Sequence, residues 1–207
     1  SIAIPTDPEH DVAELLWFPT GGGKTEAYLG IIAFTIAFRR LRGYDSKEQE
    51  FTCKSYGVSV IMRYTYRLLT IQQFQRAAVL MCACEFIRRR EKIQGTDISK
   101  WGDEPFYVAL WVGDQTTPNT LAKTETILKE FKDRAPKSSN PYQIINCPWC
   151  GEELVFNKNF KINGTPKQFR IYCNRPSCPF SEENSKEIKD FDSSLPILLI
   201  DDDIYKR

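Results

Sequence analysis

Residues 18–25 read Phe18-Pro19-Thr20-Gly21-Gly22-Gly23-Lys24-Thr25, a glycine-rich segment between a short apolar run and a helical pattern. The apolar run, Glu14 to Phe18, has the length of a strand. The apolar spacing from Lys24 to Arg42 predicts a helix that ends near Gly43. A glycine-rich loop between a strand and a helix is typical of nucleotide-binding proteins. We therefore predict a phosphate-binding loop at this point of the chain.

The residue types of this loop suit the binding of ATP with Mg²⁺. Glycines let the backbone bend tightly and direct N–H groups at phosphate oxygens, which the positive end of the following helix also attracts. Lys24 would contact the β- and γ-phosphates, and the Thr25 hydroxyl would bind Mg²⁺. The strict phosphate-loop pattern requires glycine where this chain has Phe18, so a turn that only caps the helix is the alternative. The predicted cofactor-binding residues are Thr20, Gly21, Gly22, Gly23, Lys24 and Thr25.

The remaining pattern alternates strands and helices as far as about residue 134. Val58–Met62 and Phe106–Val112 are runs of buried-strand length, and helical spacing extends from Leu68 to about Ile93 and from Pro118 to Arg134. This alternation predicts an α/β fold with a parallel sheet covered on both faces.

A segment rich in arginine, threonine and glutamine begins where the second predicted strand ends. Ligands bind at this edge in parallel α/β sheets, and such side chains can hold nucleic-acid phosphates without reading bases. An ordinary solvated helix entry explains the same residues equally well. The candidate nucleic-acid contacts are Arg63, Thr65, Arg67, Gln72, Gln73 and Arg76.

Four cysteines after residue 140 form the pattern C-x2-C, then 22 residues, then C-x4-C. Thiolates on two such turns can complete a tetrahedral Zn²⁺ site, and four ligands leave no open position, so the metal would be structural. Leu154–Phe156 and Gln168–Tyr172 are expected to be strands joined by a polar loop that contains Asn163-Gly164, as in a zinc ribbon. Unrelated cysteines or two disulfides are the alternatives. The predicted ligands are Cys147, Cys150, Cys173 and Cys178.

Basic and aromatic side chains within the ribbon allow two interpretations. They form either a surface for nucleic acid or, for the aromatic ones, the core of a small zinc module. The basic residues are Lys158, Lys161, Lys167 and Arg170, and the aromatic ones are Trp149, Phe156, Phe160 and Phe169. The three other cysteines, Cys53, Cys82 and Cys84, are expected in the core.

The composition is that of a globular protein, with 42% apolar and 13% aromatic residues. Twenty-eight Lys and Arg against 27 Asp and Glu give a net charge of +1, so overall basicity cannot carry nucleic-acid binding. The N-terminus lacks a signal-peptide pattern, and the apolar stretch from Ala27 to Phe38 is too short to cross a bilayer. We expect a cytoplasmic protein with no membrane partner.

The run Ile197–Asp202 has the form of a Walker B strand followed by acids. On that interpretation Asp201 would hold Mg²⁺ and join Lys24 and Thr25 as a catalytic residue. The alternative is an acidic loop after an edge strand.

The glycine-rich loop, followed about forty residues on by Thr65-Tyr66-Arg67-Leu68-Leu69 and Gln72-Gln73, resembles motifs I and Ia of superfamily two helicases. More narrowly, Trp17–Gly30 and Met62–Ala77, with Leu110–Gly113 and Pro118-Asn119, resemble the helicase subunits of DISARM phage-defence systems. The resemblance implies a RecA-like motor lobe, DNA at motif Ia, a second motor lobe and partner subunits of a defence complex. It also places the acidic box further downstream, which favours the acidic-loop interpretation of Asp201.

These inferences divide the chain into three parts: a RecA-like ATP-binding lobe (1–140), an inserted zinc ribbon (141–180), and a connector with a return strand of the lobe (181–207). We expect a piece of an ATP-dependent DNA helicase or translocase that binds ATP but does not hydrolyse it alone. The alternative is a zinc-containing interaction module, for nucleic acid or protein, on a nucleotide-binding scaffold without turnover.

Overall fold

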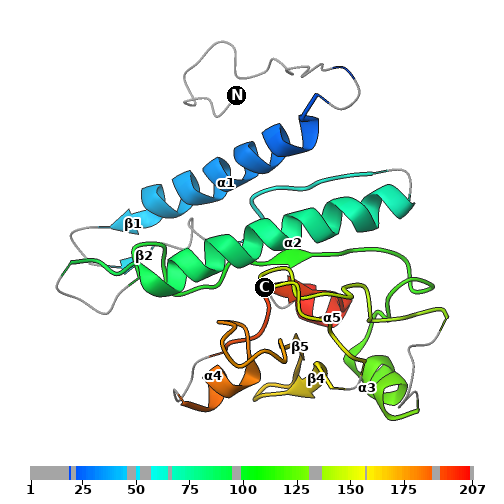
Figure 1. Ribbon diagram of the computed structural model, residues 1–207. Coiled ribbons are helices and arrows are strands. Elements are labelled where there is room, and N and C mark those ends of the chain that lie inside the picture. The colour runs from blue at the N-terminus through cyan, green and yellow to red at the C-terminus, as the bar shows by residue number, and fades with distance from the viewer. Residues whose placement is uncertain are drawn as a thin grey trace. The chain divides into compact units, whose positions relative to one another are not determined.

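The computed structural model describes residues 19, 22–45, 50–51, 57–64, 67–94, 99–130, 137–156, 158–187 and 192–205 (Figure 1). The chain divides into two compact units, Ser1–Met62 and Arg63–Arg207. None of the helices in the described ranges is long and apolar enough to cross a lipid bilayer.

The first unit is built on α1 (Lys24–Gly43), which confirms the helix predicted after the glycine-rich loop. Glu26 lies in its first turn and Arg40 and Arg42 in its last, the arrangement that complements the helix dipole. The helix leads into β1 (Tyr44–Asp45), which pairs antiparallel with β2 (Glu50–Phe51).

The structure contradicts the predicted strand Val58–Met62, which carries no strand hydrogen bonding. The carbonyl of Val58 instead accepts a hydrogen bond from Arg39 Nη1 at 2.8 Å, and the side chains of Val58 and Ile61 are 76% and 85% exposed. Residues of high strand propensity form a strand only beside another backbone that can complete the hydrogen bonds. The other strand predicted for this unit, Glu14–Phe18, lies outside the described residues.

The second unit is organised around α2 (Arg67–Arg90), which confirms the long helix predicted from Leu68. The helix packs along β3 (Val108–Ala109), and the two elements run in opposite directions (Figure 1). Near the end of the helix, Glu85 Oε2 accepts the N–H of Phe106 at 3.1 Å, just before β3 begins.

A parallel pair of strands lies in the second unit, and the return of the chain to the lobe after the ribbon stays a prediction. β6 (Ile197–Leu198) lies parallel to β3, and Leu110 N donates to Leu198 O at 2.9 Å. The predicted sheet is present in the described residues as this two-stranded pair. The wider RecA-like sheet stays a prediction.

Three further helices lie in the described part of the second unit: α3 (Leu121–Glu130), α4 (Glu182–Glu187) and α5 (Asp201–Ile204). Thr120 precedes α3, and its Oγ1 accepts the N–H of Lys123 at 3.2 Å, as an N-cap residue does. The described part of the predicted third helix is therefore confirmed.

The ribbon contains an antiparallel hairpin, β4 (Phe160–Asn163) and β5 (Gln168–Ile171), in the register Phe160↔Ile171. β5 confirms the second predicted ribbon strand, but the first predicted strand, Leu154–Phe156, is wrong. Asn159 explains the displacement, because its Oδ1 accepts from Val155 N and its Nδ2 donates to Tyr172 O. These bonds close a turn where the strand was expected.

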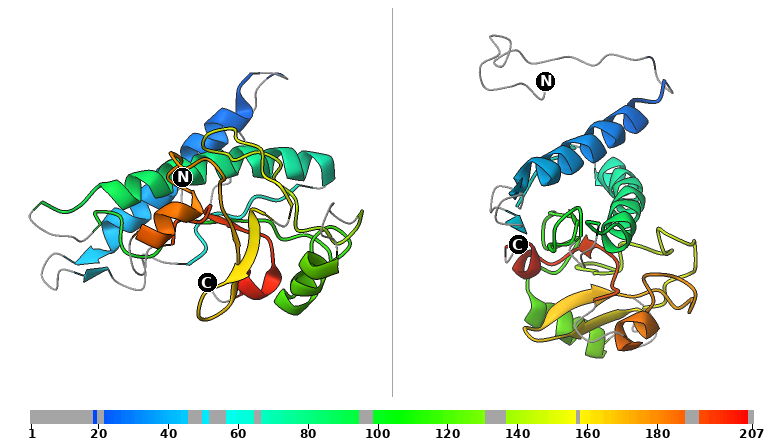
Figure 2. Two further views of the ribbon diagram at one scale, coloured as in Figure 1. Left: turned by 60° about the horizontal axis from the view of Figure 1, so that its bottom comes forward. Right: turned by 90° about the vertical axis from the view of Figure 1, so that its left-hand side faces the viewer.

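One hydrophobic core joins the ribbon to α2 and the strand pair. It contains Phe74, Ala78 and Cys82 from α2, and its ribbon and strand members include Leu154, Phe160, Phe169, Ile171, Phe180, Leu195, Ile197 and Leu199. In Figure 1, α2 lies on one side of β3 and the β4–β5 hairpin on the other, and the right-hand view of Figure 2 shows α2 and the hairpin apart in the same way. The boundaries predicted at 140/141 and 180/181 stay predictions.

Candidate functional site

Two turns bring the four predicted metal ligands together. In the first turn Gly151 N donates to Cys147 O at 2.9 Å, and Gly151 has a φ of +75°, a conformation that suits glycine. In the second, Cys178 N donates to Arg175 O at 2.9 Å, and Cys173 N donates to Phe180 O at 2.8 Å. The backbone thus directs two pairs of thiols at one point.

The four sulfur atoms all lie within 4.8 Å of one another. The Sγ–Sγ distance is 3.9 Å between Cys147 and Cys178 and 3.5 Å between Cys150 and Cys173. Sulfurs bound tetrahedrally to Zn²⁺ at ~2.3 Å would lie ~3.8 Å apart, so the donor set fits this ion. All four are free thiols, and the predicted meeting of the cysteines is confirmed, without the alternative disulfides.

The thiols of this cluster differ in acidity. A hydrogen bond from the Cys178 thiol holds the pKa of Cys147 at about 5, against the effect of burial. Burial raises the pKa of Cys173 to about 12. The pKa of Cys178 is also raised, by its hydrogen bond to Cys147 and then by burial. The Cys147 thiol therefore loses its proton readily. A bound cation would be needed to keep several of the four thiols deprotonated.

Aromatic side chains fix the cysteine cluster on α2. The Trp149 ring lies 4.5 Å from the Phe86 ring on α2 and 5.9 Å from the Phe180 ring, measured between centroids. The Arg89 guanidinium lies over Phe180 at 4.9 Å. Within the ribbon the buried rings of Phe156, Phe160 and Phe169 pack one after another with tilted planes, their centroids 6.4 Å and 6.1 Å apart, which confirms that these aromatic residues form its core.

Three of the four basic ribbon residues form ion pairs with acids. Lys161 pairs with Glu182 at 2.5 Å, Arg170 with Asp192 at 2.7 Å, and Lys167 with Glu125 at 3.7 Å. Because acids neutralise these basic side chains, the ribbon attracts phosphates less. The pairs therefore favour a structural role for the charged residues of the ribbon.

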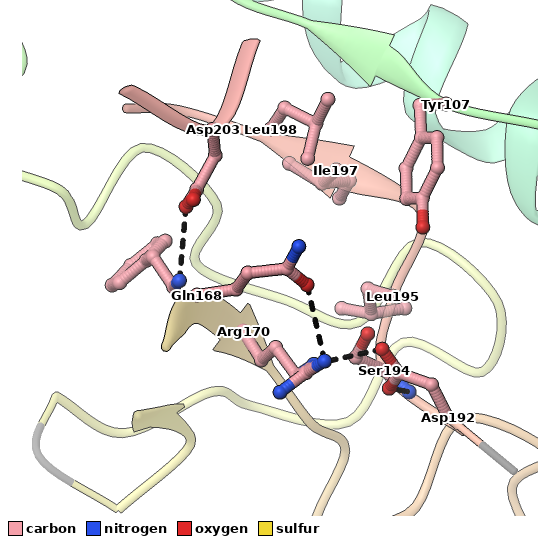
Figure 3. Close-up of a pocket in the computed structure, with 10 residues that line it drawn as sticks. Tyr107, Gln168, Arg170, Asp192, Ser194, Leu195, Ile197, Leu198 and Asp203 are labelled. Atoms are coloured by element: carbon pink, nitrogen blue, oxygen red, sulfur yellow. Dashed lines mark hydrogen bonds and ion pairs between the residues drawn. The ribbon is translucent and has the colours of Figure 1, made fainter. Parts of the chain in front are cut away.

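A small cavity lies where β5, β6 and the connector meet, and Figure 3 shows its lining. Its volume of about 10 Å³ suits one water molecule but no substrate. Arg170 donates both to Gln168 Oε1 at 3.1 Å and to Asp192 Oδ2 at 2.7 Å across its floor. The cavity lies where these elements pack together, and it is too small to be an active site.

The described part of the glycine-rich loop leads directly into α1. Gly22 N donates to Pro19 O at 3.0 Å, and Gly23 has a φ of +78°, the left-handed region that favours glycine. Lys24 and Thr25 are half-buried at the start of α1, where the first N–H groups of a helix have no partner within the helix. Thr20 and Gly21 lie outside the described residues. The described geometry suits an anion such as a phosphate.

The candidate nucleic-acid residues lie around the beginning of α2. Gln72 and Arg76 are exposed and four residues apart, so they share one face of the helix, and Arg63 is exposed before it. The Gln73 Oε1 atom is buried and has no hydrogen-bond partner among the described residues. Arg67 is the first residue of α2, and Thr65 lies outside the described residues.

Three aspartates follow β6, and the structure gives each a different environment. Asp202 Oδ2 accepts the N–H of Leu121 at 2.9 Å at the start of α3, and Asp203 Oδ2 accepts the N–H of Phe169 at 2.9 Å in β5. Sequence reasoning missed both roles. Asp201 begins α5, and its Oδ1 is buried without a hydrogen-bond partner among the described residues. Burial, and then the charge of Asp202, raises the pKa of Asp201.

The other cysteines of α2 are consistent with core positions. Cys82 is buried and Cys84 half-buried, and burial raises the pKa of Cys84 to about 11. Burial raises the pKa of Cys82 as well. Cys53 lies outside the described residues.

Comparison with known proteins gives one informative relative. No protein-family model matches the chain. The chain is 35% identical over 205 residues to the DISARM protein DrmA of Bacillus paralicheniformis. The match covers 96% of this chain and 16% of DrmA, so the chain spans about a sixth of the length of that relative.

Proposed function

We propose that this chain is the ATP-binding motor lobe of a DNA helicase or translocase that acts in anti-phage defence. The observation that carries the proposal is the glycine-rich loop, in which Gly23 turns the backbone into the start of α1 with Lys24 and Thr25 beside it. The similarity to the DISARM protein DrmA over 96% of the chain supports the defence role.

In this proposal the loop holds the phosphates of ATP. The N–H groups at the start of α1 accept negative charge because the helix dipole is positive there. Lys24 neutralises the β- and γ-phosphates, and the Thr25 hydroxyl is a ligand of Mg²⁺, which would screen charge that develops on the phosphates. Asp201 is a second candidate ligand for Mg²⁺, and its partnerless buried Oδ1 supports that role.

Nucleic acid would bind at the beginning of α2. Arg63 and Arg76 supply positive charge, and Gln72 and Gln73 supply amides that can donate to phosphate oxygens. Arg67 and Thr65 belong to the same proposed set. Hydrolysis of ATP would then move this lobe against a second motor lobe, and partner subunits of a defence complex would act with it in the cytoplasm.

The cysteine cluster would hold a structural Zn²⁺ that fixes the ribbon. All four ligand positions are filled by thiols, so the ion would have no open position for chemistry. Its contribution is to the folding free energy.

Substitution of Lys24 tests the nucleotide site. Lys24→Ala should remove the rise in melting temperature that saturating Mg·ATP gives the wild-type protein, because the phosphates lose their cation. A ligand at ~100 times its Kd stabilises a protein by about 2.7 kcal/mol, a shift that thermal unfolding resolves. The matched control is Lys129→Ala, an exposed lysine on α3. If Mg·ATP stabilises Lys24→Ala as much as wild type, the loop is not the site.

The second candidate function is a zinc-containing interaction module without turnover. The cysteine cluster favours it, because its four ligand atoms already lie at metal-binding spacing. DNA-stimulated hydrolysis of ATP by the longest form of the protein distinguishes the two candidates.

A further inference from the structure

Two large aromatic side chains that the proposed function does not use are exposed together. Trp111 is 72% exposed and Tyr205 is 73% exposed, and their ring centroids lie 6.3 Å apart with an angle of 78° between the planes. The edge of one ring therefore meets the face of the other. Exposed apolar surface of this kind frequently marks a binding site.

Both residues lie at the carboxyl edge of the parallel strand pair. Trp111 is two residues beyond β3, and Tyr205 follows α5, which itself follows β6. Because β3 and β6 are parallel, the segments that follow them emerge at the same edge. The fold thus pairs residues that are far apart in sequence.

The beginning of α2 lies toward this same edge. Its later turns lie beside the start of β3, where Glu85 accepts the N–H of Phe106, and the helix runs against the strand (Figure 1). Thirteen residues of helix separate Glu85 from Gln72, about 20 Å at ~1.5 Å per residue. That length carries Gln72 and Arg76 toward the end of β3 from which Trp111 projects.

We propose that Trp111, braced by Tyr205, stacks on a base of a single DNA strand whose phosphates are held at the beginning of α2. This inference rests on the proposed function, because it assigns the bases of the strand that the α2 residues would hold by its backbone. Stacking on an aromatic ring accepts any base, since every base has a π-face. In a duplex the base faces are already stacked, so the ring pair selects single strands.

The acids near the ring pair favour a DNA strand whose bases, and not its phosphates, face Trp111. Asp202 and Asp203 each accept a backbone hydrogen bond, from Leu121 and Phe169 respectively. Negative charge at this position repels phosphates but tolerates a neutral base. The strand would therefore run with its bases toward Trp111 and its phosphates toward Arg63 and Arg76. An arginine-rich segment of a partner protein is the rival occupant, because guanidinium groups also stack on tryptophan.

The test compares three DNA probes by fluorescence anisotropy with the longest form of the protein. The probes are an oligothymidylate of about 20 nucleotides, longer than a site of ~4–16 nucleotides, an abasic strand of equal length, and a duplex of equal length. Trp111→Ala should weaken oligothymidylate binding about 5- to 100-fold, and Trp111→Phe should stay within about threefold of wild type. Binding of the abasic strand and the duplex should not change. Ile145→Ala, an exposed apolar residue of the ribbon, is the matched control.

Arg63→Ala separates failure of this inference from failure of the proposed function. It should weaken binding of all three probes, because it removes a phosphate contact. If Arg63→Ala weakens binding and Trp111→Ala does not, the stacking role is overturned while the α2 site stands. If wild type binds none of the probes, the proposed DNA-binding function itself fails. Equal loss of binding for all three DNA probes in Trp111→Ala also overturns the stacking role. A labelled oligoarginine peptide, measured as a fourth probe, tests the rival occupant: if Trp111→Ala loses binding of this peptide while oligothymidylate binding stays intact, the stacking role is overturned as well.

Discussion

Asp201, Asp202 and Asp203 are adjacent in the chain but do different work. Asp202 satisfies the first N–H group of α3, 81 residues away in sequence, and Asp203 satisfies a β5 N–H group 34 residues away. Asp201 keeps a buried oxygen without a partner among the described residues. The carboxylates of Asp202 and Asp203 thus attach α5 to two other elements.

The buried carboxylate of Glu85 allows a test of how a single charged side chain stabilises the fold. Its side chain is fully buried and accepts from Arg88 Nε at 2.7 Å, Arg89 Nε at 2.8 Å and Phe106 N. Burial favours the neutral acid, but the hydrogen bonds and charges of the two arginines outweigh it and hold the pKa of Glu85 below its ordinary value. The ionised form is therefore the one that stabilises the fold.

The pH dependence follows from that direction. Since the folded pKa lies below the unfolded value of about 4.3, the stabilisation is present above that pH and is lost as pH falls through the folded pKa. Glu85→Gln should cost about 3–5 kcal/mol at pH 7, because it leaves two partly buried arginines without their anion, and less at pH 3. Urea unfolding across this range measures the difference, with Glu104→Gln, an exposed acid, as control. A difference that does not vary with pH would contradict the assignment.

Among the elements, those set by local pattern could be predicted and those set by distant partners could not. α1 and α2 could be predicted from apolar spacing alone. The spacing of the cysteines was enough to predict that four thiols meet. The run Val58–Met62 has strand propensity, but it carries no strand hydrogen bonding. The shift of the first ribbon strand to β4 depends on the Asn159 side chain, and residue propensities do not encode such a bond.

If the cysteine cluster holds zinc, the ion stabilises the ribbon where the ribbon packs against α2. We expect one zinc ion per chain by mass spectrometry in wild type and in Cys84→Ala, and much less in Cys150→Ala. Both residues are half-buried, but only Cys150 belongs to the cluster. Loss of the metal should lower the melting temperature by several degrees, since about 1 kcal/mol corresponds to ~2–4 °C for a domain of this size. Equal zinc content in all three proteins would exclude the site.

Over the whole molecule the positive and negative charges nearly balance, so any attraction for a charged ligand must come from local groups of side chains. The net charge is +1, and the ribbon pairs Lys161, Lys167 and Arg170 with acids. In the proposed function, attraction for DNA would therefore be concentrated at the beginning of α2. The sequence predicted the phosphate loop and this segment, but not the ring pair, because Trp111 and Tyr205 meet only through the parallel pairing of β3 and β6.

The rate of ATP hydrolysis by the longest form of the protein, with and without single-stranded DNA, tests the central proposal most directly. A motor lobe couples its phosphate loop to the strand it holds, so DNA should raise the rate on the order of tenfold or more in wild type and in Lys129→Ala. Lys24→Ala should remove hydrolysis with and without DNA. A wild-type rate that equals that of Lys24→Ala, or that does not respond to DNA, would contradict the assignment of this chain as a DNA-dependent motor lobe.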